Sequence, residues 1–160
     1  MNNVENGSGP RHLVLSSSGV YAYAVNEMAG SVDAFQVTTT GLKKIQTTII
    51  DTVQTTGDHG SGAIRLSPDG KWLLASNRVT SNQVVINKVL SDGKLAKADH
   101  VEVTKKPRFF NFDPTGKFVF VCGQDGDLIQ VFSFDSSTGK MKSMQHDVEV
   151  VSPVAIEFLR

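Results

Sequence analysis

Residues 63–78 read AIRLSPDGKWLLASNR, and this stretch decides the fold because it recurs. A first copy, PRHLVLSSSGVYAYAVNE, occupies residues 10–27, and a third, PRFFNFDPTGKFVFVCGQ, occupies residues 107–124. Each copy consists of two runs rich in β-branched, aromatic and other apolar residues, separated by a turn that ends in glycine. The turn glycines are Gly19, Gly70 and Gly116. Their separations of 51 and 46 residues are typical of four-stranded propeller blades.

Two more strand-like runs follow each copy. The third strands are expected over 31–37, 83–89 and 128–134, and the fourth over 43–50, 98–103 and 144–150. No window shows a helical apolar stripe with capping residues. We therefore predict an all-β fold, a β-propeller of about three four-stranded blades with blade-like repeats at about 10–51, 61–104 and 107–150.

The last residues, SPVAIEFL at 152–159, repeat only the first strand of a blade. We expect them to form a closing C-terminal strand, so that residues 1–160 make one partial β-propeller domain. Propellers have 4–8 blades, and three blades with a closing strand suggest the C-terminal portion of a seven-bladed chain. The alternative is a small protein that self-associates through its open blade edges. The apolar row left open is Leu13 with Leu15, or Phe110 with Phe112, depending on which face looks outward.

Composition excludes several classes of protein. Sixteen Lys and Arg balance sixteen Asp and Glu, whereas a duplex DNA-binding protein needs a basic excess. No apolar run is long enough to span a membrane, and the polar start is not a signal peptide. The single cysteine, Cys122, cannot form an internal disulfide, and four scattered histidines give no zinc signature. We expect a soluble, cytoplasmic domain that binds no nucleic acid, membrane, metal or cofactor.

The candidate site follows from hairpin geometry. Residues equidistant from a hairpin turn face each other, unless a bulge shifts them by one. The facing pairs are then Arg11 with Glu27, Gly62 with Arg78, and Arg108 with Gln124. All lie where the first strand begins and the second ends, and in a propeller these ends converge on one mouth of the central channel. Arginines there suit an anionic small molecule, because guanidinium groups bind carboxylate or phosphate bidentately.

Simpler interpretations of the same residues stay open. An arginine opposite a glutamate can be only a cross-strand ion pair. The glycine-rich stretch 57–62 resembles an anion-binding loop, but no helix follows it, and we interpret it as a connector. Cys122 stands in an apolar run and is expected to pack as a small hydrophobic residue.

The motifs resemble a known family. Gly9-Pro10-Arg11-His12 followed by residues 23–27, the SPDG turn at 67–70 with Arg78 behind it, the DPTG turn at 113–116 and SPV at 152–154 are similar to the lactonase family of seven-bladed β-propellers. That family includes bacterial-type 6-phosphogluconolactonase and the fungal carboxymuconate-cyclising enzyme. The chain departs from the family's usual pattern at 62–64, where Gly-Ala-Ile replaces Ala-Glu-Ile, and at 123–125, where Gly-Gln-Asp replaces Asn-Gln-Asp.

The resemblance implies a lactone hydrolase of the 6-phosphogluconolactonase type, acting on a small anionic lactone at the channel mouth. It implies catalytic roles for Glu27, Arg11 and Arg78. The expected substrate-binding residues are Arg11, His12, Arg78, Arg108 and Gln124. Glu27 is either a general base or the residue that orients Arg11. The alternatives are a carboxymuconate-type lactonising enzyme and a non-catalytic propeller scaffold that binds proteins. We expect the 160 residues by themselves to be catalytically weak or inactive, because three blades would supply only part of the anion-binding rim.

Overall fold

The computed structural model describes residues 4–51, 53 and 57–159. Every regular element in these residues is a strand, so no helix long and apolar enough to cross a membrane occurs among them. The strands are β1 (Pro10–Leu15), β2 (Tyr21–Asn26), β3 (Ser31–Thr38), β4 (Gly41–Ile49), β5 (Ser61–Leu66), β6 (Trp72–Asn77), β7 (Gln83–Val89), β8 (Leu95–Glu102), β9 (Pro107–Phe112), β10 (Phe118–Gly123), β11 (Leu128–Asp135), β12 (Lys140–Ser143) and β13 (Val148–Glu149).

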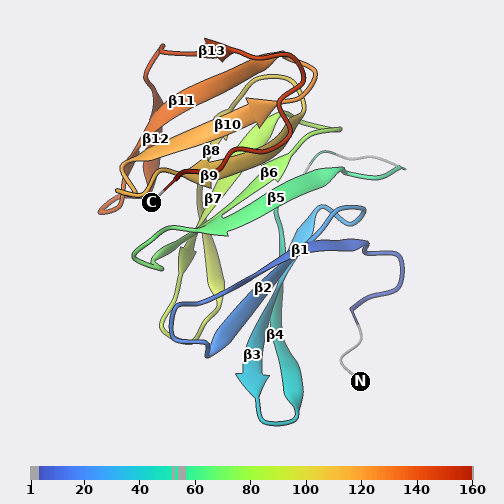
Figure 1. Cartoon of the computed structure of the whole chain (residues 1–160). Helices are drawn as coiled ribbons and strands as arrows, with labels where there is room; N and C mark the ends of the chain where they lie inside the picture. The colour runs from blue at the N-terminus through green and yellow to red at the C-terminus, as the bar shows by residue number, and fades with distance from the viewer. Residues whose placement is uncertain (1–3, 52, 54–56, 160) are drawn as a thin grey trace.

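The strands form three antiparallel sheets, each connected strand to neighbouring strand. Blade 1 is β1 to β4, blade 2 is β5 to β8, and blade 3 is β9 to β12 with β13. Figure 1 shows the three blades fanned out one after another, with their first strands β1, β5 and β9 next to each other. The predicted partial propeller of three four-stranded blades is confirmed.

The first turn of each blade is built from the same hydrogen bonds. The residue that follows the first strand is Ser16, Ser67 or Asp113, and its side-chain oxygen accepts the N–H of the residue that starts the second strand. The glycine two residues before the second strand has a φ of 71°, 71° and 69° in the three blades. Glycine adopts this left-handed conformation without the Cβ clash of other residues. The recurring sequence therefore encodes a recurring turn.

Blades 2 and 3 each bury one face against the blade before them. Ile64 of blade 2 packs into a core with Tyr23 and Val25 of blade 1, and Phe110 of blade 3 packs into a core with Trp72 and Leu74 of blade 2. Burial of these side chains removes apolar surface from water and fixes neighbouring blades relative to each other. We call the region where the first strands begin and the second strands end the rim. Packing on both sides of blade 2 therefore holds this rim in place.

Aromatic residues of the second strand join each blade to the next. Tyr23 Oη donates to the Gly93 carbonyl of blade 2 (3.0 Å), and Trp72 Nε1 donates to the Ser136 carbonyl of blade 3 (2.8 Å). Gly93 and Gly139, in the turns before β8 and β12, have positive φ, and a Cβ on either would overlap the ring of Tyr21 or Trp72. These glycines let the aromatic rings lie directly on the backbone of the following blade.

The structure corrects the fourth strand of blade 3, which the sequence predicts at 144–150. The edge strand is instead divided: β12 pairs with the end of β11, and β13 pairs with its beginning. Between them the chain turns at Gln145, whose φ is 55°. A positive φ at this position breaks the extended conformation that a continuous strand requires.

The structure also lacks the closing strand predicted at 152–159, because this segment makes no strand pairing with any strand in the described residues. It lies on blade 3 through side chains instead. Phe158 makes an edge-to-face contact with Phe120 (5.1 Å between ring centroids), and Asn111 donates to the Ile156 carbonyl (3.3 Å). A sequence that resembles a first strand becomes one only where a neighbouring strand offers unpaired backbone groups in register.

Prediction for the inter-blade contact. We expect Gly139→Ala to lower the free energy of unfolding by about 2–4 kcal/mol, through the left-handed φ and the overlap with Trp72. Gly19→Ala is the matched control, because Gly19 has a similar φ but open space where a Cβ would lie. It is expected to cost about 1 kcal/mol. Urea denaturation measures both, and equal losses would contradict the proposed packing.

Candidate active site

Glu27 lies at the centre of the candidate site, between two arginines from adjacent blades. Its Oε2 is 3.5 Å from Nε of Arg11, and its Oε1 accepts a hydrogen bond from Nη2 of Arg78. The side chain of Arg78 is 9% exposed, that of Arg11 18% and that of Glu27 34%. One carboxylate therefore separates two guanidinium groups that would otherwise repel each other in a partly buried position.

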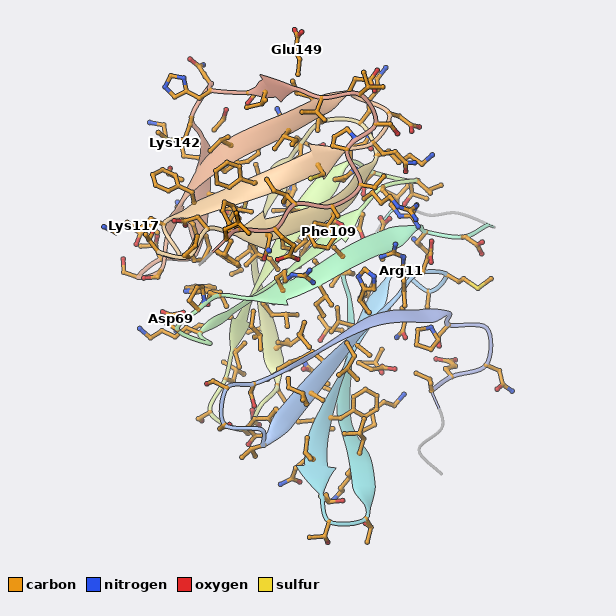
Figure 2. All side chains as sticks on the ribbon, in the orientation of Figure 1. Arg11, Asp69, Phe109, Lys117, Lys142 and Glu149 are labelled. Atoms are coloured by element: carbon orange, nitrogen blue, oxygen red, sulfur yellow. The ribbon has the colours of Figure 1, made fainter. Side chains whose placement is uncertain are left out.

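Arg11 reaches this position because β1 contains a bulge. The ladder pairs Pro10 with Asn26 and His12 with Val25, so Arg11 is the extra residue between them. A bulge redirects the side chain of the extra residue, and Arg11 Nη1 donates to the Gly62 carbonyl of blade 2 (2.8 Å). Figure 2 shows Arg11 between β1 and β5. The predicted meeting of Arg11 with Glu27 is found, but as a side-chain contact rather than as a facing backbone pair.

The same register break occurs in the other two blades. It lies between Ser61 and Ile64 in β5 and next to Pro107 in β9, opposite the Cys122–Gly123 step. The predicted facing pairs Gly62 with Arg78 and Arg108 with Gln124 are therefore shifted by the bulge. The register breaks therefore occur at the same position in the first strand of each blade.

Gly62 allows the blades to approach each other at this rim. A Cβ there would lie 3.1 Å from the carbonyl oxygen of Pro107 and 2.8 Å from Oγ of Ser76. The absent side chain leaves the Gly62 carbonyl open to Arg11 while β9 packs behind it. Glycine at position 62 therefore permits the close contact between β5 and β9.

The connector before β5 supports Glu27 through its backbone. The N–H groups of Gly60 and Ser61 donate to the Glu27 carbonyl (2.9 and 3.1 Å), and Arg78 N–H donates to the Gly60 carbonyl (3.2 Å). The segment leads into a strand rather than a helix, in agreement with its interpretation as a connector. It links the main chains of Glu27 and Arg78.

A buried carboxylate that the sequence pattern does not single out anchors this connector. Asp51 is 3% exposed; its Oδ2 accepts a hydrogen bond from Thr80 and lies 3.5 Å from Nδ1 of His59. Oδ1 accepts the Val53 N–H (3.1 Å). The sequence signal is weak, because a lone aspartate after a fourth strand looks like an ordinary loop residue.

His12 lies beside Arg11, which donates to its ring. Burial lowers the pKa of His12, the charges of Arg11, Arg65 and Arg108 lower it further, and Glu27 partly opposes them. Burial and the Arg78 charge likewise lower the pKa of Arg11, against the effect of Glu27. His12 is therefore a neutral imidazole at pH 7 within a positively charged rim.

The remaining predicted residues lie at the same end of blade 3. Arg108 is near enough for its charge to act on both Arg11 and His12. Gln124 follows β10, and its N–H donates to the Lys106 carbonyl (3.0 Å). Its side-chain Oε1 is buried with no hydrogen-bond partner among the described residues. Their proposed contacts with substrate stay predictions.

Arg65 is a further cation near the site that the hairpin geometry does not select. It lies on β5 with its Cζ 4.6 Å from the centre of the Phe109 ring. The sequence signal that could have identified Arg65 is a charged residue inside a mostly apolar strand. Among the residues that the structure describes, no three His, Cys, Asp or Glu side chains are grouped to hold a metal ion, and a metal-free reaction stays a prediction.

Comparison with known proteins identifies the family of the chain. The model of the lactonase family, described as a seven-bladed β-propeller, matches residues 1–158. The chain belongs to this lactonase family. Its bulged first strands, shared carboxylate and four-stranded blades therefore belong to a lactonase-type propeller.

Individual relatives agree with this family. The 6-phosphogluconolactonase of Serratia proteamaculans is 34% identical over 141 residues, which are 86% of this chain and 42% of that protein. A Bacteroides fragilis structure described as a candidate 6-phosphogluconolactonase has 40% identity and a TM-score of 0.92, over 99% of this chain and 44% of that one. The periplasmic gluconolactonase of Pseudomonas aeruginosa has 38% identity and a TM-score of 0.90, over 96% and 43%. The chain spans less than half the length of these relatives.

Prediction for the electrostatics of the rim. We expect the NMR titration of His12 to have its midpoint below the ordinary histidine value of about 6.5. Glu27→Gln should lower the midpoint further, and Arg11→Met should raise it, because the two charges act in opposite directions. Since the unfolded chain binds this proton at a higher pH, His12 destabilises the fold as the pH falls through about 6.5. Glu149→Gln, on exposed β13, is the control that should leave the His12 midpoint unchanged; a midpoint unaffected by Glu27→Gln would refute the arrangement.

Proposed function

We propose that this chain supplies catalytic residues of a carboxylic ester hydrolase that opens a sugar-acid lactone, of the 6-phosphogluconolactonase type. The observation that carries the proposal is the Glu27 carboxylate shared by Arg11 and Arg78 at the rim where the first strands of three blades converge. The names of the Serratia and Pseudomonas relatives, which refer to lactone hydrolysis, support the same reaction class. The expected cytoplasmic location stays a prediction.

Lactone opening needs water to attack the ester carbonyl and positive charge where the carbonyl oxygen becomes negative. Arg11 and Arg78 provide that charge from a partly buried position, where electrostatic stabilisation is stronger than in water. The product is a carboxylate, which a guanidinium group binds through two parallel hydrogen bonds. The same pair of arginines therefore serves the transition state and the product.

Glu27 fits the role of holding the arginines better than that of a base. Both of its oxygens face a guanidinium group, so accepting a proton from water would break one of these contacts. If Glu27 positions Arg11 and Arg78, its loss weakens binding of a carboxylate product as well as turnover. If it is the base, its loss reduces turnover and leaves product binding unchanged.

Prediction for the reaction. We expect only weak hydrolysis of glucono-δ-lactone or 6-phosphogluconolactone by the 160-residue chain, measured as acid release above the spontaneous rate and compared with a seven-bladed relative. Glu27→Gln should reduce kcat/KM by about 100-fold and weaken gluconate binding, whereas Glu149→Gln should retain both. Figure 2 shows Glu149 at the far edge of blade 3 from Arg11. An unsubstituted chain that neither hydrolyses a lactone nor binds gluconate would overturn the proposed function.

We further propose that the open face of blade 1 drives self-association of this chain. Leu13 occupies the position of Ile64 and Phe110 in the other blades; these two are fully buried against a preceding blade, whereas Leu13 is 50% and Leu15 57% exposed. Phe112 is also buried, so the open row is Leu13 with Leu15. An apolar row that packs in two blades and faces water in the third favours association.

Prediction for self-association. We expect light scattering on the 160-residue chain to give a mass above 17.3 kDa that rises with protein concentration. Leu13→Glu combined with Leu15→Glu should reduce this mass, because it would bury two charges in the interface. Val151→Glu, which changes an exposed valine elsewhere, should not. A monomer at all concentrations would refute the proposal.

A further inference from the structure

Arg65 is a cation with unused hydrogen-bonding capacity next to the candidate site. Its Cζ lies 4.6 Å from the Phe109 ring centre, and its Nη1 donates to the Ile64 carbonyl (2.9 Å). No carboxylate lies within 4 Å of it among the described residues, and Glu157 acts on it only from a greater distance. A guanidinium group has five N–H donors, and Arg65 makes one hydrogen bond among the described residues. The cation–π contact holds the group in place without neutralising it.

Arg65 lies on β5, the strand that contributes Gly62 to the rim, and it is further along this strand than Gly62. Arg11 binds the Gly62 carbonyl and Arg65 binds the Ile64 carbonyl. These two carbonyls are two residues apart, which corresponds to about 7 Å along a strand. His12 is linked to both cations: it contacts Arg11, and the charge of Arg65 acts on it. The rim therefore combines a pair of arginines around Glu27, a neutral imidazole, and a third arginine, Arg65.

We propose that Arg65 binds a phosphate group on the far end of the lactone substrate, and so selects phosphorylated over unphosphorylated sugar lactones. This inference rests on the proposed function, because it assumes that the lactone carbonyl lies at Arg11 and Arg78. The separation of the two cationic positions suits a six-carbon sugar acid with an anionic group on its last carbon. A guanidinium fork binds phosphate bidentately, and His12 offers a neutral polar contact to the hydroxyl groups between.

A purely structural role for Arg65 gives a different expectation. An arginine that only covers the Phe109 ring would change stability when replaced, without changing the choice between two ligands. The products gluconate and 6-phosphogluconate differ only in the phosphate group and do not react further, so their relative affinity isolates the contact proposed for Arg65.

The test is calorimetric titration of the 160-residue chain with each product. We expect 6-phosphogluconate to bind more tightly than gluconate, and Arg65→Met to reduce this preference by about 10- to 100-fold with little change in gluconate affinity. Arg65→Lys, which keeps the charge and loses the fork, should retain part of the preference. Lys71→Met, which removes an exposed cation from the same blade, is the matched control and should retain all of it. Inorganic phosphate should compete with 6-phosphogluconate on the unsubstituted chain and not on Arg65→Met.

Folding and function are separated by two further measurements. If Arg65→Met lowers the thermal midpoint, Arg65→Gln keeps a polar end without the charge, and the same loss of preference is expected. An unchanged preference in a folded variant, or no preference in the unsubstituted chain, overturns the inference. A chain that binds neither product and hydrolyses neither lactone contradicts the proposed function instead.

Discussion

The shared carboxylate of Glu27 is the interaction on which the candidate site depends. Arg11 comes from blade 1 and Arg78 from blade 2, and both guanidinium groups are largely buried at the blade boundary. Two like charges in such a position destabilise the fold unless an opposite charge lies between them. The bulge in β1 and the hydrogen bonds from Gly60 and Ser61 to the Glu27 main chain place that carboxylate. The chemistry of the rim is thus inseparable from the junction between the blades.

Packing between the blades fixes the relative position of the residues at this junction. Blade 2 is held on one side by the core around Tyr23 and Ile64, and on the other by the core around Trp72 and Phe110. Aromatic rings lying on turn glycines of the next blade, Tyr21 on Gly93 and Trp72 on Gly139, add contacts that have almost no freedom to shift. A propeller can therefore position charged groups from different blades within hydrogen-bonding distance through packed strands alone.

The sequence predicted the fold well, because its strand–turn–strand pattern recurs, and it predicted the contact between Arg11 and Glu27. The repeated strand–turn–strand patterns, whose turns end in Gly19, Gly70 and Gly116, defined the blades. Counting outward from these glycines placed Arg11 opposite Glu27. The sequence did not predict the bulges and gave them only as a possible one-residue shift, because no local pattern distinguishes an extra residue from a paired one. The break at Gln145 and the unpaired segment 152–159 depend on neighbouring strands, which a linear pattern does not describe. Asp51 and Arg65 lie outside the repeated motif positions, and only the three-dimensional contacts show their relation to the rim.

A double-mutant cycle between Glu27 and Arg78 measures whether this carboxylate joins the two blades. The free energies of unfolding of the unsubstituted chain, Glu27→Gln, Arg78→Met and the double variant are measured by urea denaturation under identical conditions. If the carboxylate joins the two blades at the site, the two changes are coupled by at least about 1 kcal/mol, because the second replacement removes a partner that the first has already lost. Additive losses, with a coupling below about 0.3 kcal/mol, would show that Glu27 and Arg78 do not join the blades.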